Sequence, residues 1–99
     1  MFEFDPLHRK AGVGILIGDK DERMKGYAYE ALLLLARYSF DILNMHQLFC
    51  HIENSNQASL RLFSKAGFRT CGVIRDWIVY NDTWHDVTMM QLLRPSKLI

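Results

Sequence analysis

The sequence predicts a small α/β domain with the order strand, helix, strand, helix, strand, strand. Three observations predict this fold. Short apolar runs of strand length alternate with two helical patterns, and the longer helical pattern separates the first two strands. The chain then closes on two alternating segments around a turn. A strand, a crossover helix and a second strand form a βαβ unit, so we expect these two strands to be parallel. The closing pair is expected to be an antiparallel hairpin.

The first strand is expected over residues 12–17 (GVGILI), a short branched run that is apolar on both sides. Its two glycines indicate a bulge or a close backbone approach. Before it, residues 2–4 alternate like the end of another strand, and Asp5-Pro6 is a turn signal. Residues 19–25 are expected to form a charged loop.

A helical period predicts the long helix from Tyr27 to Leu43. Its expected buried face consists of Ala28, Ala31, Leu32, Leu35, Ser39 and Ile42. Leu33 and Leu34 widen this face beyond that of a surface helix. After Asn44, the run QLFCHIE at residues 47–53 predicts a second buried strand.

The second helix is expected to begin after the cap residue Asn56 and to run through Ala66. Gly67 stands just after the helix, where a residue with a left-handed backbone conformation is expected. Phe68 is expected to pack against Phe63 in a Schellman motif. Residues 72–80 and 84–92 then alternate with period two around Asn81-Asp82, which predicts the hairpin.

Composition limits the classes of function. The 99 residues are expected to form a single domain, 1–99, and the net charge of +1 argues against a non-specific nucleic-acid binder. No apolar run approaches the roughly 20 residues of a membrane helix, and we see no signal-peptide pattern. Two cysteines cannot by themselves make a disulfide framework or a four-ligand zinc site. We therefore expect a cytoplasmic chain with reduced thiols, no metal and no membrane contact.

Two segments are candidates for a binding or catalytic role. The first is Arg23-Met24-Lys25-Gly26-Tyr27-Ala28, which places a glycine and two cations where the chain enters the long helix. Free N–H groups and the helix dipole favour anions there, so this segment is a candidate phosphate or pyrophosphate site. The alternative is a solvated charged loop. The second segment, residues 56–68, is by itself only a well-capped helix.

Together the two segments resemble the GNAT N-acetyltransferase superfamily. Residues 23–28 match the pattern R/Q-x-x-G-x-A/G, and residues 56–68 match N-x-x-S-x-x-L-F/Y-x-K-x-G-F. Residues 38–46 resemble more narrowly the bacterial spermidine and ribosomal-protein acetyltransferase branch. The resemblance covers about residues 2–93 and implies the C-terminal half of a GNAT fold. In that fold the parallel strand pair splays apart and the cofactor enters between the strands.

The resemblance implies acetyl-CoA as the cofactor and acetyl transfer to a primary amine, with polyamine, protein and small-molecule acceptors all open. The backbone of the first strand would pair with pantetheine, residues 23–29 would bind the pyrophosphate, and Asn56 and Ser59 would face the pantetheine arm. The implied cofactor-binding residues are Ile15, Leu16, Ile17, Arg23, Met24, Lys25, Gly26, Tyr27, Ala28, Tyr29, Asn56, Ser59 and Phe63.

Two positions depart from the family pattern. Phe63 stands where many relatives have a tyrosine that protonates the leaving thiolate, and Gly12 stands where many have a glutamate that serves the general base. The candidates that remain are His51 and Glu53, which share one face of the second strand. His51 can act as a base and Glu53 can order a water. The alternative for His51 is a structural histidine.

The other polar and aromatic residues are expected to be structural. Cys50 lies on the face opposite His51 and is expected in the core. His85 and Asp86 lie on opposite faces of a strand, so they cannot act as a pair. Three aromatic residues flank the hairpin turn: Trp77, Tyr80 and Trp84. We expect them to pack across the strands, with an acceptor site or an interface as the alternatives.

Full members of the family place further helices and strands ahead of the first strand here. We therefore expect a fragment, a truncated gene product or a chain completed by another chain. The strand at residues 12–17 would then be an exposed apolar edge, and the leucine face of the long helix would be partly bare. A homodimer through one of these two surfaces is expected. The rival function is a non-catalytic remnant that binds CoA or only a partner chain.

Overall fold

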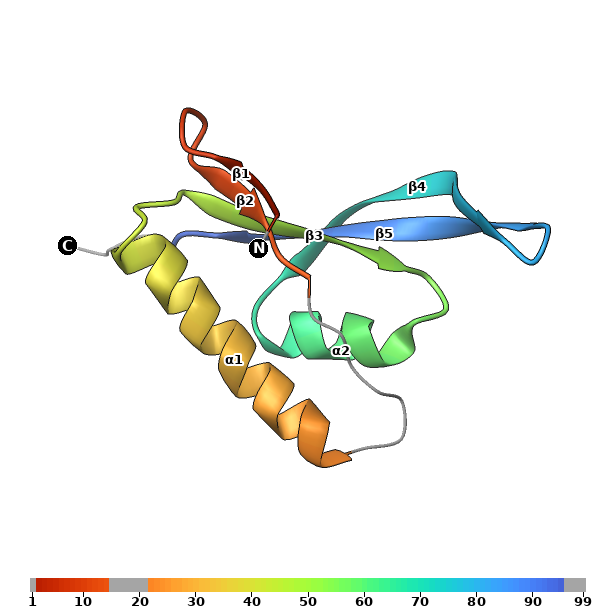
Figure 1. Ribbon diagram of the computed structural model, residues 1–99, viewed down its shortest axis with the longest axis horizontal. Helices are drawn as coiled ribbons and strands as arrows, with labels where there is room; N and C mark the ends of the chain where they lie inside the picture. Colours follow the sequence, from red (N-terminus) through yellow and green to blue (C-terminus); the bar gives the residue numbers. More distant parts are fainter. Residues whose placement is uncertain (1, 15–21, 96–99) are drawn as a thin grey trace.

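The computed structural model describes residues 2–14 and 22–95, and within them one five-stranded sheet carries two helices on the same face (Figure 1). The elements are β1 (Phe2–Asp5), β2 (Lys10–Gly12), α1 (Glu22–Asp41), β3 (Gln47–Glu53), α2 (Gln57–Lys65), β4 (Arg69–Tyr80) and β5 (Thr83–Leu93). The strand order in the sheet is β1-β2-β3-β5-β4. The predicted α/β fold, with a parallel pair and a closing hairpin, is confirmed.

The parallel pair β2 and β3 stays together only briefly. Ala11 lies opposite Leu48 and Gly12 opposite Phe49, and the Val13 N–H still donates to the Phe49 carbonyl at 2.9 Å. Past this bond β3 continues to Glu53 with no strand beside it on that side, as far as the described residues extend. On its other side β3 pairs with β5 along its whole length. Within the described residues, the pairing of the two strands therefore ends at Val13.

The first strand differs from its prediction. It begins at Lys10 and not at Gly12, and of the predicted residues 12–17, Ile15, Leu16 and Ile17 lie outside the described residues. It is also not an edge, because β1 pairs with it antiparallel on one side and β3 lies on the other. For the described residues of this strand the expectation of an exposed apolar edge is wrong, since β1 supplies a partner.

Helix α1 begins at Glu22, earlier than the predicted Tyr27, and ends at Asp41 instead of Leu43. The residues it buries are Leu32, Ala36, Ser39 and Phe40. These positions follow the i, i+4, i+7, i+8 spacing of one helix face. Ala31 and Ile42 were expected in the core and are exposed, because the helix turns them away from the buried face.

Helix α2 is confirmed almost to the residue. The Asn56 side chain accepts from the Ser59 N–H at 3.1 Å, which caps the N-terminus. At the other end the Phe68 N–H donates to the Phe63 carbonyl and the Gly67 N–H to the Ser64 carbonyl, which is the Schellman pattern. The rings of Phe63 and Phe68 meet edge to face, with centroids 5.0 Å apart. These hydrogen bonds and the ring contact hold the C-terminal end of α2 in place.

Gly67→Ala is expected to destabilise the domain by about 1–2 kcal/mol, because Gly67 has a φ of +102°, a conformation that disfavours a Cβ. The new Cβ would also lie 3.4 Å from the Leu92 Cδ1 atom. Urea unfolding measures the change. Gly72→Ala is the control, because a Cβ at Gly72 meets nothing within 4 Å. Equal stability of the two variants would contradict the prediction.

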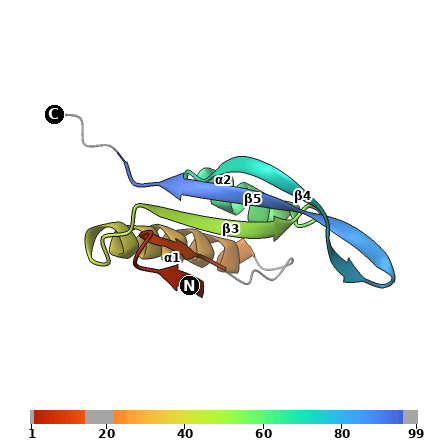
Figure 2. The same ribbon diagram turned by 90° about the horizontal axis from the view of Figure 1, so that it is seen from above.

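The hairpin of β4 and β5 turns at Asn81 and Asp82, whose φ angles are 50° and 56°. Positive φ at both central residues is the type I′ geometry that matches the twist of the strands. The two strands reach far beyond the helices (Figure 2), and β4 is an edge strand with nearly every residue exposed. Within the described residues no helix is long and apolar enough to cross a membrane.

Candidate functional site

A narrow cavity of about 120 Å³, which we call the inter-strand slot, opens where β2 and β3 part. Its walls come from the end of β2, the second half of β3 and the start of α2: Val13, Gly14, Cys50, His51, Ile52, Glu53, Asn56, Ser59 and Phe63. Residues alternate along a strand, so Cys50 and Ile52 face the helices while His51 and Glu53 face the other side of the sheet. The slot therefore joins the two faces of the sheet.

The slot suits an extended ligand that carries amides. Beyond the Val13–Phe49 bond, the described part of the chain places no strand along this edge of β3. Backbone groups at such an edge need partners, and the amides of an extended arm can supply them. The core-facing wall is apolar, with Ile52 and Phe63 buried. A chain with amides and short apolar links fits these walls.

Several predicted site residues meet at this slot. Asn56, Ser59 and Phe63 line it together with His51 and Glu53. The Asn56 Oδ1 atom caps α2, which leaves its amide N–H groups for a ligand, and the Ser59 side chain is buried. Phe63 is 2% exposed and packs on Phe68, so no hydroxyl stands there. Gly12, at the end of β2, likewise has no side chain for proton transfer.

The segment 23–28 is helical, and the prediction of a strand-to-helix turn at Gly26 is wrong. Residues 22–25, expected in a charged loop, form the first turn of α1. Gly26 is exposed and a Cβ built there meets nothing within 4 Å, so open space lies beside this turn. Tyr27 is exposed, and the Lys65 Nζ atom lies 4.4 Å from the centroid of the Tyr29 ring.

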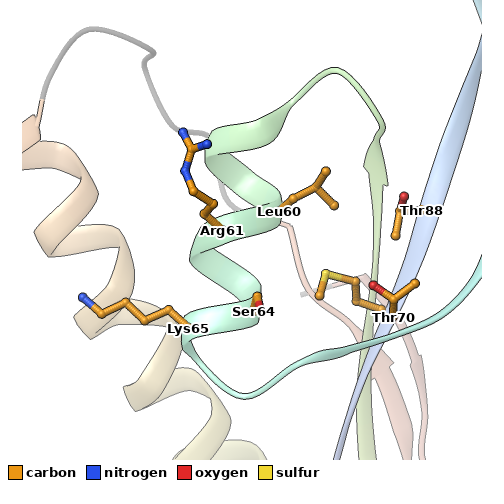
Figure 3. A pocket seen from close by; sticks show the side chains of 7 residues that line it. Leu60, Arg61, Ser64, Lys65, Thr70 and Thr88 are labelled. Carbon is orange, nitrogen blue, oxygen red and sulfur yellow. The ribbon is translucent and has the colours of Figure 1, made fainter.

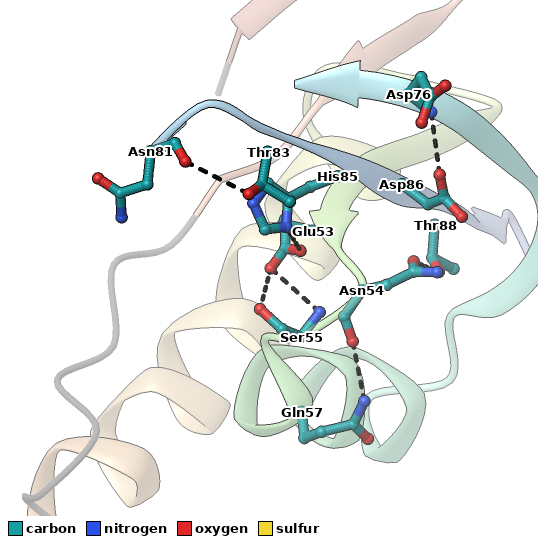
Figure 4. A network of polar contacts seen from close by, with 10 residues as sticks. All are labelled: Glu53, Asn54, Ser55, Gln57, Asp76, Asn81, Thr83, His85, Asp86 and Thr88. Atoms are coloured by element: carbon teal, nitrogen blue, oxygen red, sulfur yellow. Dashed lines mark hydrogen bonds and ion pairs between the residues drawn. The ribbon is translucent and has the colours of Figure 1, made fainter. Parts of the chain in front are cut away.

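Glu53 and His85 form a pair that the sequence analysis missed. The Glu53 Oε1 atom lies 3.2 Å from the His85 Nδ1 atom (Figure 4). The Oε2 atom accepts from the Ser55 N–H at 3.0 Å and from the Ser55 hydroxyl. His85 also stacks on Tyr80, with ring centroids 3.7 Å apart and planes 2° apart. The strand register places Glu53 opposite Val87, so His85 two residues earlier shares its face.

A second cavity of about 560 Å³, which we call the hairpin cavity, adjoins this pair. It is lined by Glu53, Asn54, Ser55, Arg75, Asp76, Trp84, His85 and Asp86. The Asp86 Oδ1 atom accepts from the Asp76 N–H at 2.9 Å, where the pairing of β4 with β5 is irregular. His85 and Asp86 do not pair with each other, as predicted. Trp77, Tyr80 and Trp84 are exposed, and of the three Tyr80 shows the expected cross-strand packing, through its stack on His85.

A larger groove of about 590 Å³ lies beside α2 (Figure 3), and none of the described residues that line it also lines the slot. It is lined by Leu60, Arg61, Ser64, Lys65, Thr70, Thr88 and Met90. The charged end of Lys65 points toward α1, and those of Arg61 and Lys65 both point away from Thr70 and Thr88 (Figure 3).

Both cysteines are free. Burial raises the pKa of the Cys50 thiol to about 12, so it stays protonated at neutral pH and is no nucleophile. This agrees with its predicted place in the core. Among the residues that the structure describes, no group of three or more His, Cys, Asp or Glu side chains could hold a metal ion.

A parallel strand pair that parts beside a capped helix agrees with an acetyl-CoA-binding α/β domain of the kind that the sequence motifs imply. Comparison with known families bears this out, since residues 1–69 match the family described as acetyltransferase (GNAT) domain. The chain belongs to this family.

Its relatives are acetyltransferases. Spermidine N(1)-acetyltransferase of Vibrio cholerae is 29% identical over 98 residues, which cover 99% of this chain and 56% of that protein. The probable N-acetyltransferase YjcK of Bacillus subtilis is 32% identical over 78 residues, or 79% and 43% of the two chains. The structure of the Vibrio enzyme with CoA and spermine matches 90% of this chain and 52% of that one, with 29% identity and a TM-score of 0.80. The chain thus spans about half the length of the curated relatives it matches.

Proposed function

We propose that residues 1–99 form a single acetyl-CoA-binding domain of a GNAT N-acetyltransferase, which transfers acetyl from acetyl-CoA to a primary amine. The inter-strand slot is the observation that supports this most directly. Its place beside residues 50–53 of β3 and its apolar and polar walls suit the pantetheine arm. The slot delivers the thioester to the face of the sheet that bears His51 and Glu53. A neutral amine then attacks the thioester carbonyl, polarised by backbone N–H groups near Leu16 and Ile17.

The cofactor-binding residues follow the same proposal. Pantetheine pairs with the backbone at Ile15 to Ile17 and passes Asn56 and Ser59. The pyrophosphate lies at the first turn of α1, where the helix N-terminus and the sequence cations Arg23 and Lys25 favour an anion. The residues from Met24 to Tyr29 surround the pyrophosphate. Phe63 forms part of the apolar wall of the inter-strand slot.

The acceptor that we propose is a polyamine, ahead of protein and other small-molecule amines. A relative named for spermidine and a solved structure with spermine favour it. We place the reaction in the cytoplasm, where free thiols such as those of Cys50 and Cys71 stay reduced.

Two measurements test the proposal. Calorimetry with CoA is expected to show binding, and a thiol-release assay with acetyl-CoA and spermidine is expected to show acetyl transfer. No heat with CoA would overturn the cofactor site. Binding of CoA without any acetylated product from spermidine or other amines would favour the rival, a domain that binds CoA without catalysis.

Phe63 is the observation that favours this rival. The side chain is buried against Phe68 and has no proton for the departing sulfur. Proton transfer contributes about 10²–10⁴-fold to an enzymatic rate, so turnover by this chain is expected to be slow. Phe63→Tyr is expected to raise the rate, because its hydroxyl can protonate the thiolate. An unchanged rate would show that another group already serves the sulfur.

We further propose that a second copy of the chain covers the outer face of α1. This face has an apolar stripe at helical spacing: Tyr27, Ala31, Leu34, Tyr38 and Ile42. Leu34 is 65% and Ile42 is 68% exposed, and such stripes are typical of helix pairing. The alternative interface, the first strand, is already paired on both sides.

Light scattering with size exclusion is expected to give twice the chain mass of 11.6 kDa. Leu34→Lys is expected to lower this mass, because it places a charge in the apolar stripe. Leu7→Lys is the matched control, since Leu7 is exposed in the turn between β1 and β2. A folded monomer of the unchanged chain would contradict the proposed dimer.

A further inference from the structure

Glu53 stands in the wall that separates two cavities. It lines the inter-strand slot on one side and the hairpin cavity on the other, and no other residue in the described part of the chain is common to both. If the slot holds the pantetheine arm, the hairpin cavity is where an acceptor amine can approach the thioester. A carboxylate between the two lies where the amine nitrogen loses its proton.

We propose that Glu53 is the catalytic residue that accepts the proton of the attacking amine, and that His85 is the positioning residue that holds it. The proposal rests on the acetyltransferase function proposed above. It gives this chain a proton acceptor on β3, in place of the glutamate that the family pattern puts at the position of Gly12.

The hydrogen bonds around Glu53 fix its orientation. The His85 Nδ1 atom forms an ion-pair contact with Oε1 at 3.2 Å, and since a carboxylate can only accept, we infer that Nδ1 carries the hydrogen of this contact. The Oε2 atom is held by the N–H and hydroxyl of Ser55. Both oxygens are thus anchored, and the side chains of Glu53 and His85 are 19% and 20% exposed. A carboxylate held this way loses little entropy when it meets a substrate.

The His85 ring is itself fixed by its surroundings. It stacks on Tyr80 with nearly parallel planes, and its Nε2 atom is buried with no hydrogen-bond partner among the described residues. Nε2 is therefore closed to a substrate, and His85 acts on the reaction only through its Nδ1 bond to Glu53. This is why we assign His85 a positioning role.

His51 is the other candidate on this face, and the geometry favours Glu53 over it. His51 is exposed, and its ring contacts the Phe49 ring at 5.8 Å between centroids. It has no carboxylate partner in the described part of the chain and does not line the hairpin cavity.

The chemical step balances in protons and electrons. The amine lone pair forms the C–N bond to the thioester carbonyl carbon, and the C–S bond breaks with its electron pair on the CoA sulfur. The proton released from nitrogen passes to the Glu53 carboxylate, which returns it to water. The products are the N-acetylated amine and CoA thiolate, which water protonates.

Glu53→Gln tests the assignment with a side chain of the same shape. We expect it to lower kcat for spermidine acetylation by about 10²–10⁴-fold, while the Kd for CoA stays within twofold. Glu30→Gln is the matched control, because it makes the same chemical change on the exposed surface of α1. Thermal unfolding confirms that each variant is folded.

Two changes at position 85 separate positioning from packing. His85→Ala removes the donor and is expected to lower kcat about tenfold, the effect of one charge-assisted hydrogen bond. His85→Asn keeps an amide N–H near the place of Nδ1 and is expected to recover most of that loss, although it also removes the stack on Tyr80. Equal losses in the two variants would reduce His85 to a packing role and overturn its assignment.

The outcomes for Glu53 are distinct. Turnover by the unchanged chain that Glu53→Gln does not reduce would overturn this inference and leave the acetyltransferase function standing. CoA binding without turnover by the unchanged chain would overturn that function and this inference together. Nitrogen-detected NMR of the imidazole provides a check without turnover. It is expected to show the hydrogen of His85 on Nδ1, and a hydrogen on Nε2 alone would refute the proposed geometry.

Discussion

Phe68→Ala is expected to lower the free energy of unfolding by about 3–5 kcal/mol, the largest single-residue effect on stability that we predict. Phe68 is 2% exposed and is among the largest fully buried side chains of the described core. Its ring meets Phe63 edge to face, and its N–H closes the end of α2. Removal of the ring leaves a cavity between α2 and the sheet. A typical domain is stable by about 5–15 kcal/mol, so the variant approaches the limit of folding.

Urea unfolding followed by circular dichroism measures this loss. Leu7→Ala is the matched control, because Leu7 is 83% exposed and its truncation is expected to change stability by less than about 0.5 kcal/mol. A loss below about 1 kcal/mol in Phe68→Ala would mean that α2 does not depend on this contact.

Gly26→Asp is expected to weaken CoA binding about tenfold or more. Open space surrounds Gly26, so the new side chain causes no clash. An aspartate near the start of a helix is favourable to the helix itself, which leaves the fold intact. Against a pyrophosphate at the first turn of α1, however, each unit charge at about 4 Å contributes roughly 1 kcal/mol of repulsion even in water. Gly26→Asp is therefore expected to lower the affinity for CoA without lowering the stability of the protein.

Gly26→Ala is the control for this change. It is expected to stabilise α1 by about 0.5–1 kcal/mol, because glycine is a poor helix former, and to leave CoA affinity within twofold. Calorimetric titration with CoA and with pantetheine, which has no pyrophosphate, compares the variants. If Gly26→Asp binds CoA as tightly as Gly26→Ala, the pyrophosphate lies elsewhere. Pantetheine affinity is expected to be the same in both variants.

The sequence by itself determined the parts of this protein that local interactions control. The cap at Asn56, the left-handed Gly67 and the contact of Phe63 with Phe68 involve residues within one short helix and its ends. The hairpin turn at residues 81–82 is equally local. Hydrogen bonds and steric limits between near neighbours suffice to specify such features, so residue order alone predicted them. The family motifs depend on the same segments.

The tertiary structure alone decided where the first strand and the long helix begin. Where the first strand begins depends on a register between distant segments, and the pairing of Lys10–Gly12 with both β1 and β3 shows that it begins at Lys10. The same is true of Glu53 and His85, which lie 3.2 Å apart although they belong to different strands. Alternation showed which face each residue takes within its own strand, but only the register of β3 against β5 brings the two side chains together.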